Sequence, residues 1–349
     1  MNKSRKGLFA MGLVVLVAAA LPLLPSGGPD RAVVAFYNLE NLFDTLDTPG
    51  VLDEEFTPGA QKQWNSERYW LKIERKAEVL KKLSAEAGVE GASVIGLCET
   101  ENRTVLEDLV ASEDLKDLDY QIIHYDSPDK RGIDVALLYR ADAFVPENSR
   151  AVPLLLTNEE GQRVFTRDQL VVSGRLHGSP IHFIVNHWPA RSRGRGGEDF
   201  REQAAKLTRS LSDSILAEDR KARIVIMGDF NDDPTDLSMQ HFLGAALERD
   251  SLGDSRLFNA TAPLFAEGQG SLKYRGKWNL FDQMVVSKGL LKERFRGYYY
   301  HSAHIYGPDY LLQQEGDYAG YTWRTYVGNW YHGGYSDHLP VYLVLERKR

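Results

Sequence analysis

Short polar clusters recur in this chain beside apolar runs that are rich in strand-forming residues. The clusters contain Asn38 after "VVAFY", Glu99 after "VIGLC", His187 after "HFIVN", Asp229 and Asn231 after "IVIMG", Asp282 after "WNLF", and Asp337 with His338 before "LPVYLV". Carboxylate and amide oxygens are the ligands that Mg²⁺ and Mn²⁺ prefer, and carboxylates and imidazoles transfer protons in hydrolytic reactions. These residue types indicate metal-assisted hydrolysis, provided that the fold brings the strand ends together.

Each cluster also has a plain structural explanation when it is taken alone. Asn38 is suited to capping a turn, Glu99 to capping a helix over "ENRTVLEDLV", and "GDFNDDP" has the composition of a loop. Ser, Asp and Pro before "VYLV" are typical of the start of a strand. Single clusters therefore favour turns, whereas acceptors and imidazoles at so many strand ends favour one shared site.

The elements that must position these residues alternate between strand and helix patterns. Strands are predicted at "RAVVAFYNLE", "ASVIGLC", "GIDVALLYR", "QLVVSGRLH", "PIHFIVNHW", "ARIVIMGDF" and "FDQMVVS". A helix is predicted over residues 66–87, with Ser66 as the N-cap and an apolar face of Trp70, Ile73, Ala77, Leu80 and Leu83. A second is predicted over residues 198–217, with Phe200, Ala204, Leu207, Leu211 and Ile215 on one face. The pattern predicts one mixed α/β domain over residues 30–349.

Composition excludes several classes of protein. The chain has 349 residues, 43% of them hydrophobic, which is enough for a large core. A net charge of −7 argues against a broad basic surface that holds nucleic acid by charge alone. The single cysteine, Cys98, lies in an apolar run and excludes an internal disulfide framework and a cysteine zinc site. We expect Cys98 to be buried.

The N-terminus has the layout of a targeting segment. Lys3, Arg5 and Lys6 precede an apolar run over residues 8–24, and "PSGGPD" follows it. This order predicts a signal peptide within residues 1–29 and a secreted or periplasmic protein. The alternative is an uncleaved N-terminal anchor, which would be the protein's contact with a membrane.

The motifs, taken together and in order, resemble those of the metal-dependent endonuclease/exonuclease/phosphatase superfamily with the DNase I-like fold, in an exported bacterial-type member. The resemblance rests on "FYNLEN", "LCETEN", "RGIDVALLYR", "NHWPAR", "GDFNDDP", "WNLFDQMVVS" and "GGYSDHLPV", and it extends over most of the chain after residue 30. It implies a four-layer αββα sandwich, with the site at one edge of two packed β-sheets.

The resemblance also implies residue roles. For the metal, Mg²⁺ or Mn²⁺ with Ca²⁺ as a further candidate, it implies Glu99 as principal ligand with Asn38 and Asp337 beside it. For catalysis it implies that Asp229 orients or deprotonates the attacking water, Asn231 supports a phosphate oxygen, Asp282 orients His338, and His187 stabilises the transition state or protonates the leaving group. Which histidine is acid and which is base stays open.

Other residues near the motifs have competing interpretations. Glu101 follows Glu99 by two residues, and Glu99 is preferred because it directly follows the apolar run. Arg131 matches the place of a phosphate-binding arginine, and the alternative is a charged loop residue. Arg191 is a candidate substrate ligand, with Arg193 and Arg195 after it on a glycine-rich stretch, although solvated charge is the favoured explanation of the three.

The predicted substrate is a phosphodiester of nucleic acid, and no obligate protein partner is expected. The alternative substrates are inositol phosphates or phospholipid head groups, which would make the protein a phosphatase or a phospholipase-like hydrolase. A surface binding protein that has kept the fold without the activity is a third alternative. The fold is shared among these classes and does not choose between them.

Overall fold

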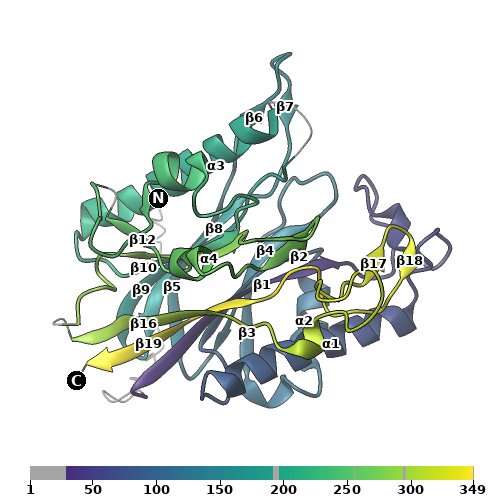
Figure 1. Cartoon of the computed structure of the whole chain (residues 1–349), viewed down its shortest axis with the longest axis horizontal. Coiled ribbons are helices and arrows are strands. Elements are labelled where there is room, and N and C mark those ends of the chain that lie inside the picture. Colours follow the sequence, from purple (N-terminus) through teal and green to yellow (C-terminus); the bar gives the residue numbers. More distant parts are fainter. Residues whose placement is uncertain (1–28, 192–195, 255, 294–295, 349) are drawn as a thin grey trace, which may run out of the picture.

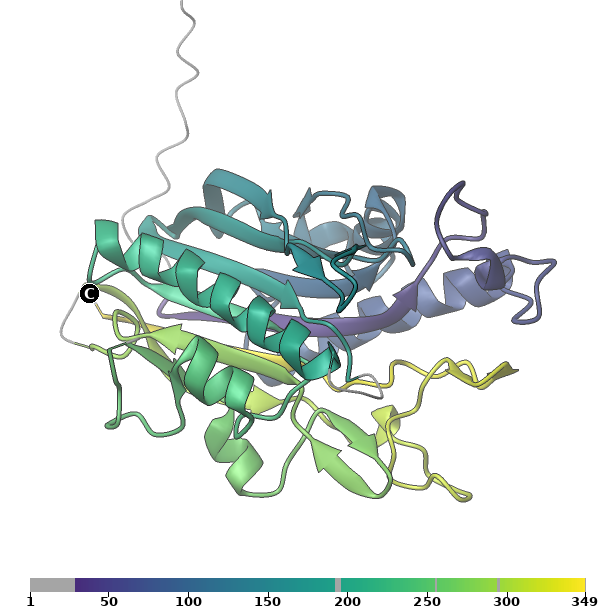
Figure 2. The same cartoon turned by 90° about the horizontal axis from the view of Figure 1, so that it is seen from above.

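The computed structural model describes residues 29–191, 196–254, 256–293 and 296–348. Two large β-sheets pack face to face, and helices cover the outer face of each sheet (Figures 1 and 2). This confirms the predicted four-layer αββα sandwich. The predicted strands are confirmed as β1, β2, β4, β8, β9, β10 and β15, and Cys98 is buried between the sheets.

The first sheet contains both ends of the described chain. Its strand order is β16 (Gly297–Ile305), β19 (Val341–Lys348), β1 (Arg31–Leu42), β2 (Val94–Thr100), β4 (Asp134–Arg140) and β3 (Tyr120–His124). Along β1, Val33 and Tyr37 face the helices α1 (Ser66–Glu86) and α2 (Arg103–Ala111), while Val34 and Phe36 face the second sheet. Both faces of β1 are covered, which explains its nearly continuous apolar run.

The second sheet supplies the other half of the sandwich. Its strand order is β11 (Ala245–Ala246), β12 (Leu257–Asn259), β15 (Asp282–Ser287), β10 (Ile224–Asp229), β9 (Ser179–His187), β8 (Gln169–Leu176) and β5 (Phe144–Val152). Phe183 and Met227 face the first sheet. Ile184 and Ile226 face α3 (Gly196–Glu218), which confirms the second predicted helix, and the short π-helical turn η3 (Ser238–Leu243).

Smaller elements surround the sandwich. They are the hairpins β6 (Leu156–Thr157) with β7 (Arg163–Val164), β13 (Leu272–Tyr274) with β14 (Lys277–Asn279), and β17 (Tyr326–Val327) with β18 (Trp330–Tyr331), the helix α4 (Ala262–Ala266), and the 3₁₀ turns η1 (Glu54–Phe56), η2 (Lys116–Leu118) and η4 (Asp309–Leu311). Residues 306–340, between β16 and β19, form a long excursion that we call the C-terminal arm. The β17–β18 hairpin belongs to this arm and lies near α1 (Figure 1).

The structure corrects two details of the first predicted helix. Asn65, and not Ser66, is the N-cap of α1, because its side chain accepts a hydrogen bond from the Arg68 amide. Trp70 is 47% exposed and does not belong to the buried face. That face includes Lys72 and Lys76 instead, because the C-terminal arm covers a side of α1 that local spacing assigned to solvent.

Within the described part of the chain, every helix is too short or too polar to cross a lipid bilayer. The segment that predicts export, or an anchor, lies in residues 1–28, outside the described residues. Export therefore stays a prediction from the sequence.

Candidate active site

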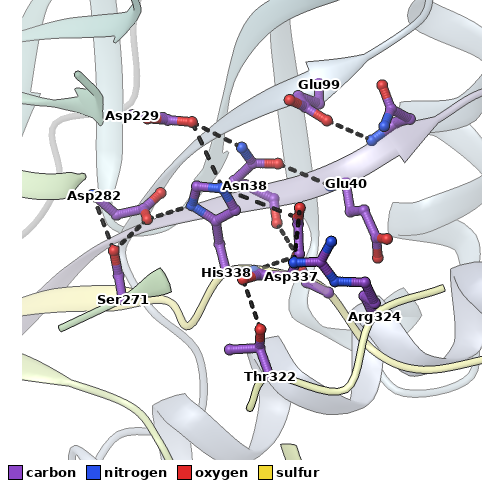
Figure 3. A network of polar contacts seen from close by, with 12 residues as sticks. Asn38, Glu40, Glu99, Asp229, Ser271, Asp282, Thr322, Arg324, Asp337 and His338 are labelled. Atoms are coloured by element: carbon purple, nitrogen blue, oxygen red, sulfur yellow. Dashed lines mark hydrogen bonds and ion pairs between the residues drawn. The ribbon is translucent and has the colours of Figure 1, made fainter. Parts of the chain in front are cut away.

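Strand register places the site residues of the second sheet in one row. Asp229 at the end of β10 is paired with His187 at the end of β9 and with Asp282 at the start of β15. In the first sheet, Asn38 on β1 is paired with Cys98 on β2, next to Glu99. The two sets of residues meet where Asn38 donates to Asp229 (Figure 3), and His187 lies 3.7 Å from Asp229 and 3.8 Å from Glu99. Neighbouring strand ends thus explain why polar residues so distant in sequence converge.

β-Bulges aim the residues that come from the first sheet. The register of β1 with β2 shifts between Asn38 and Leu42, and that of β2 with β4 shifts between Cys98 and Thr100. Glu99 has φ +60°, in the left-handed region that residues other than glycine seldom occupy. Its carboxylate accepts a hydrogen bond of 2.7 Å from the Asn41 amide, whose own φ is +51°. Strain of this kind persists where the surroundings enforce it, and it commonly marks functional sites.

The same bulge separates Glu99 from Glu101. The Glu101 carboxylate accepts hydrogen bonds from the Asp44 amide at 2.5 Å and from the Thr48 hydroxyl at 3.1 Å. Burial raises the pKa of Glu101 to about 7. Glu101 therefore anchors the segment over residues 44–65, whereas Glu99 lies in the site.

His338 is held between carboxylates. Its Nδ1 lies 2.6 Å from Oδ2 of Asp282, and the Ser271 hydroxyl donates to the same Oδ2 at 2.5 Å. Its Nε2 lies 3.9 Å from Oδ2 of Asp229 and 3.9 Å from Oδ1 of Asp337. Burial alone would lower the pKa of His338, but Asp282, Asp229 and Asp337 together raise it well above its usual value. The ring is thus a cation whose orientation Asp282 fixes.

Asp229 links Asn38 with His338 (Figure 3). Its Oδ2 accepts a hydrogen bond of 3.0 Å from the Asn38 amide group, and its Oδ1 accepts one of 2.9 Å from the Asn231 backbone. Burial raises the pKa of Asp229 above the usual range; His338 opposes this rise and Asp282 adds to it. A carboxylate with a raised pKa is a better proton acceptor near neutral pH.

His187 has the opposite electrostatic environment from His338. Its Nε2 lies 3.7 Å from Oδ2 of Asp229 and 3.8 Å from Oε1 of Glu99. Burial lowers the pKa of His187 well below its usual value, and Arg167, Arg131 and His338 lower it further. His187 is therefore neutral near pH 7, which suits a hydrogen-bond donor to a charged oxygen better than a proton donor.

Arg167 is a site residue that sequence reasoning missed. It is 7% exposed, forms an ion pair of 3.0 Å with Oδ2 of Asp129, and donates to the Trp188 carbonyl at 2.7 Å. The "TRDQ" stretch before β8 carries no motif that marks it. What marks Arg167 as a site residue is its burial next to His187, and this position arises only in the folded chain.

A buried network behind Asn38 and Glu99 was also missed. Lys72 is 3% exposed, and its Nζ donates to the Glu40 carbonyl and, at 3.0 Å, to the Thr325 hydroxyl. The Glu40 carboxylate in turn accepts hydrogen bonds of 2.8 Å from the amide and the hydroxyl of Thr325. Lys76 donates to the Tyr335 carbonyl. This network ties the bulge of β1 to α1 and to the C-terminal arm.

Three further predicted residues lie around this centre. Asp337 is partly exposed, and its Oδ2 lies 3.9 Å from Nη2 of Arg324 (Figure 3). Asn231 has φ +53° and donates to the Trp188 carbonyl at 3.0 Å. Arg131 is half-exposed on a loop beside His187, with its Nε 3.9 Å from Oδ1 of Asp129.

Arg191 lies among carboxylates. Its guanidinium contacts Asp232 at 3.2 Å, Asp233 at 3.2 Å and Asp236 at 2.5 Å, and it lies 4.5 Å from the centre of the Phe281 ring. A substrate phosphate would compete with these carboxylates, so substrate binding by Arg191 stays a prediction. Arg193 and Arg195 lie outside the described residues.

The donor set fits a hard divalent cation. Glu99, Asn38, Asp229 and Asp337 offer carboxylate and amide oxygens at the edge of the sheets, and the nearby Cys98 thiol is buried in the core. Asp229, Asp282 and His338 also offer one ligand atom each within 4.8 Å of one another. Because His338 and Asp282 are hydrogen-bonded to each other, these two side chains are less available to a cation than the oxygens of Glu99, Asn38 and Asp337.

Comparisons with known proteins agree with this geometry. Residues 33–347 match the model of the Endonuclease/Exonuclease/phosphatase family. A crystal structure of a member from Bacteroides thetaiotaomicron superposes with a TM-score of 0.54 at 17% identity, covering 91% of this chain and 95% of that one. The mannosyl-6-phosphatase of that bacterium gives 0.55 at 16% identity, covering 90% and 99%.

TDP2 from D. rerio, in a complex with single-strand DNA product, gives a TM-score of 0.54 at 12% identity, covering 91% of this chain and 100% of that one. No curated protein matches the chain. At these identities the solved structures establish the fold, and the match over residues 33–347 establishes the relationship. The chain belongs to the endonuclease/exonuclease/phosphatase family, whose members are hydrolases that act on phosphate esters and generally depend on divalent metals.

Proposed function

We propose that the protein is a metal-dependent phosphodiesterase that hydrolyses nucleic acid without strong sequence preference. The observation that carries this proposal is the chain of side chains from Asp282 through His338 to Asp229, which faces Asn38 and Glu99. It brings together a proton acceptor (Asp229), a protonated imidazole of fixed orientation (His338) and oxygen ligands for a metal (Asn38 and Glu99). Hydrolysis of a phosphate ester requires these three functions.

The side chains divide the chemical work according to their charge states. Asp229 accepts a proton from the attacking water, because burial has raised its pKa toward neutrality. His338, held cationic by Asp282, donates a hydrogen bond to a phosphate oxygen. Neutral His187 donates a hydrogen bond to a second phosphate oxygen as negative charge develops. The ester bond opposite the attacking water breaks, and the leaving oxygen takes up a proton from solvent. A divalent cation held by Glu99, Asn38 and Asp337 supplies Lewis-acid neutralisation of the phosphate when it is bound.

Cationic residues near the site support a polyanionic substrate. Arg131, Arg167 and Arg324 lie close to His187 or Asp337. The overall charge of −7 limits the number of phosphate contacts, so we expect modest affinity and a shallow dependence of binding on salt. The competing substrates are inositol phosphates and phospholipid head groups.

A substrate panel tests the proposal. Purified protein is incubated with Mg²⁺, Mn²⁺ or Ca²⁺ and with single- and double-stranded DNA, RNA, inositol polyphosphates, phosphoinositides and sphingomyelin, with His338→Ala as the inactive control. We expect shortened nucleic acid with Mg²⁺ or Mn²⁺. Phosphate release from inositol polyphosphates with intact DNA and RNA would replace the nuclease proposal with its alternative.

A further inference from the structure

A groove opens between the β13–β14 hairpin and the C-terminal arm. Its volume is about 300 Å³. Its walls combine cations with phenol rings, and they include Lys273, Tyr274, Arg275, Tyr318, Tyr321 and Arg324. We call it the aromatic groove. Tyr274 is 60% exposed and Tyr318 is 49% exposed, so much of each side chain faces solvent.

Contacts across the groove hold its two walls together. The Lys273 ammonium donates to the Gly320 carbonyl at 3.2 Å and lies 5.1 Å from the centre of the Tyr321 ring. The Gly276 amide, in the turn of the hairpin, donates to the Tyr321 hydroxyl at 2.6 Å. Figure 2 shows the hairpin (light green) beside the arm (yellow). The groove is therefore built by packed elements before any ligand binds.

Both walls continue into segments that hold catalytic residues. On the arm, the Thr322 hydroxyl donates to the Asp337 carbonyl at 2.8 Å, and Nη2 of Arg324 lies 3.9 Å from Oδ2 of Asp337 (Figure 3). On the hairpin side, Ser271 directly precedes β13 and donates to Asp282 at 2.5 Å. A ligand that reaches from the reacting phosphate into the groove passes Arg324.

We propose that the aromatic groove binds the nucleotide next to the scissile phosphate in a single-stranded nucleic acid. This inference rests on the proposed function and names its substrate class. Tyr274 and Tyr318 stack on the base, and Arg275 and Arg324 pair with the adjoining phosphate. Aromatic side chains with nearby cations are the usual platform for single strands, since every base has a flat face. In a duplex those faces are already stacked, so the groove selects unpaired bases.

Binding to the inactive full chain tests the inference. The Kd of His338→Ala for fluorescent single-stranded oligonucleotides and for the matched duplex is measured with Mg²⁺ by anisotropy. In the His338→Ala background, Tyr274→Ala and Tyr318→Ala should each raise the Kd for the single strand about tenfold and raise the Kd for the duplex less. Tyr274→Phe should retain the affinity, because the ring remains. Arg275→Ala should lower the slope of log Kd against log salt by about one.

The control is Trp70→Ala, which removes an exposed aromatic residue from α1, outside the groove. It should leave single-strand affinity unchanged. If the wild type cleaves DNA but Tyr274→Ala and Tyr318→Ala bind single strands like their parent, the groove inference is wrong and the nuclease proposal stands. If the wild type cleaves no nucleic acid and the groove variants lose affinity for a sugar phosphate, the groove inference and the nuclease proposal are both wrong. Thermal melting checks folding, and Tyr274→Phe decides the outcome if Tyr274→Ala is unstable.

Discussion

The second sheet supplies its site residues from regular strand ends, whereas the first sheet supplies Asn38 and Glu99 from bulged strands. His187, Asp229 and Asp282 occupy adjacent positions across β9, β10 and β15 without a shift in register. Around Asn38 and Glu99 the register shifts twice, and left-handed backbone appears at Glu99 and at Asn41. We call His187, Asp229 and Asp282 the regular half of the site, and Asn38 with Glu99 the bulged half. A regular ladder fixes the spacing of its side chains, whereas a bulge changes the direction in which they point.

The support behind the two halves differs as well. The regular half is held by the ladders of the sheet and by the core between the sheets. The bulged half depends on side chains brought from elsewhere, namely Lys72 on α1 and Thr325 on the C-terminal arm. Catalytic failure should therefore follow changes in the regular half, and loss of metal affinity or stability should follow changes in the bulged half.

Metal removal should have the largest effect. We expect EDTA to abolish hydrolysis and Mg²⁺ or Mn²⁺ to restore it, because the oxygens of the bulged half need a cation to neutralise the phosphate. Glu99→Gln should raise the Mg²⁺ concentration needed for half-maximal rate and lower the rate. Glu101→Gln is the matched control. It should leave the Mg²⁺ requirement unchanged, because Glu101 binds the segment over residues 44–65 and does not face the site. Full activity after exhaustive chelation would contradict the metal site.

Asp229→Asn should have the largest effect among substitutions in the regular half. The amide cannot accept the proton of the attacking water, so kcat should fall about 10³-fold. The variant should stay folded, because an amide retains an acceptor oxygen for the Asn231 backbone. Steady-state kinetics with circular dichroism measures both properties. A wild-type rate would remove Asp229 from the chemistry.

Asp282→Asn should lower kcat about 10²-fold and change its pH dependence. Asp282 is the main charge that raises the pKa of His338 well above its usual value and so favours the protonated ring. Without that charge the pKa falls, so the alkaline limb of the pH–rate profile should move to lower pH. An NMR titration of the imidazole should show the same direction. An unmoved limb would mean that protonation of His338 is not required.

Lys72→Met should have the smallest effect and should act through the bulge. It leaves the Glu40 carbonyl and the Thr325 hydroxyl without their buried donor, so unfolding free energy should fall by about 1–3 kcal/mol. The matched control is Lys81→Met, which breaks an exposed ion pair with Asp114 and should leave stability nearly unchanged, because solvent screens the pair. Equal losses in the two variants, measured by urea unfolding, would show that the bulge needs no support from α1.

Much of the site was predictable because its residues flank strands that the sequence marks clearly. Apolar runs ending in Asn38, Glu99, His187 and Asp229 identify strands with polar ends, and the order of the motifs identifies the family. Arg167 was not predictable, since its environment comes from Asp129 and Trp188 on other segments. The burial of Lys72 and Lys76 depends likewise on where the C-terminal arm packs.

The sequence by itself determined which residues can bind a metal or transfer a proton, and on which strands they lie, because residue type and hydrophobic period are local properties. Only the tertiary structure decided their charge states and directions. The pKa of His338 is raised by carboxylates from β10 and β15, while that of His187 is lowered by burial and arginines. Burial and charge act through space, so two histidines of identical chemistry acquire opposite protonation in one site.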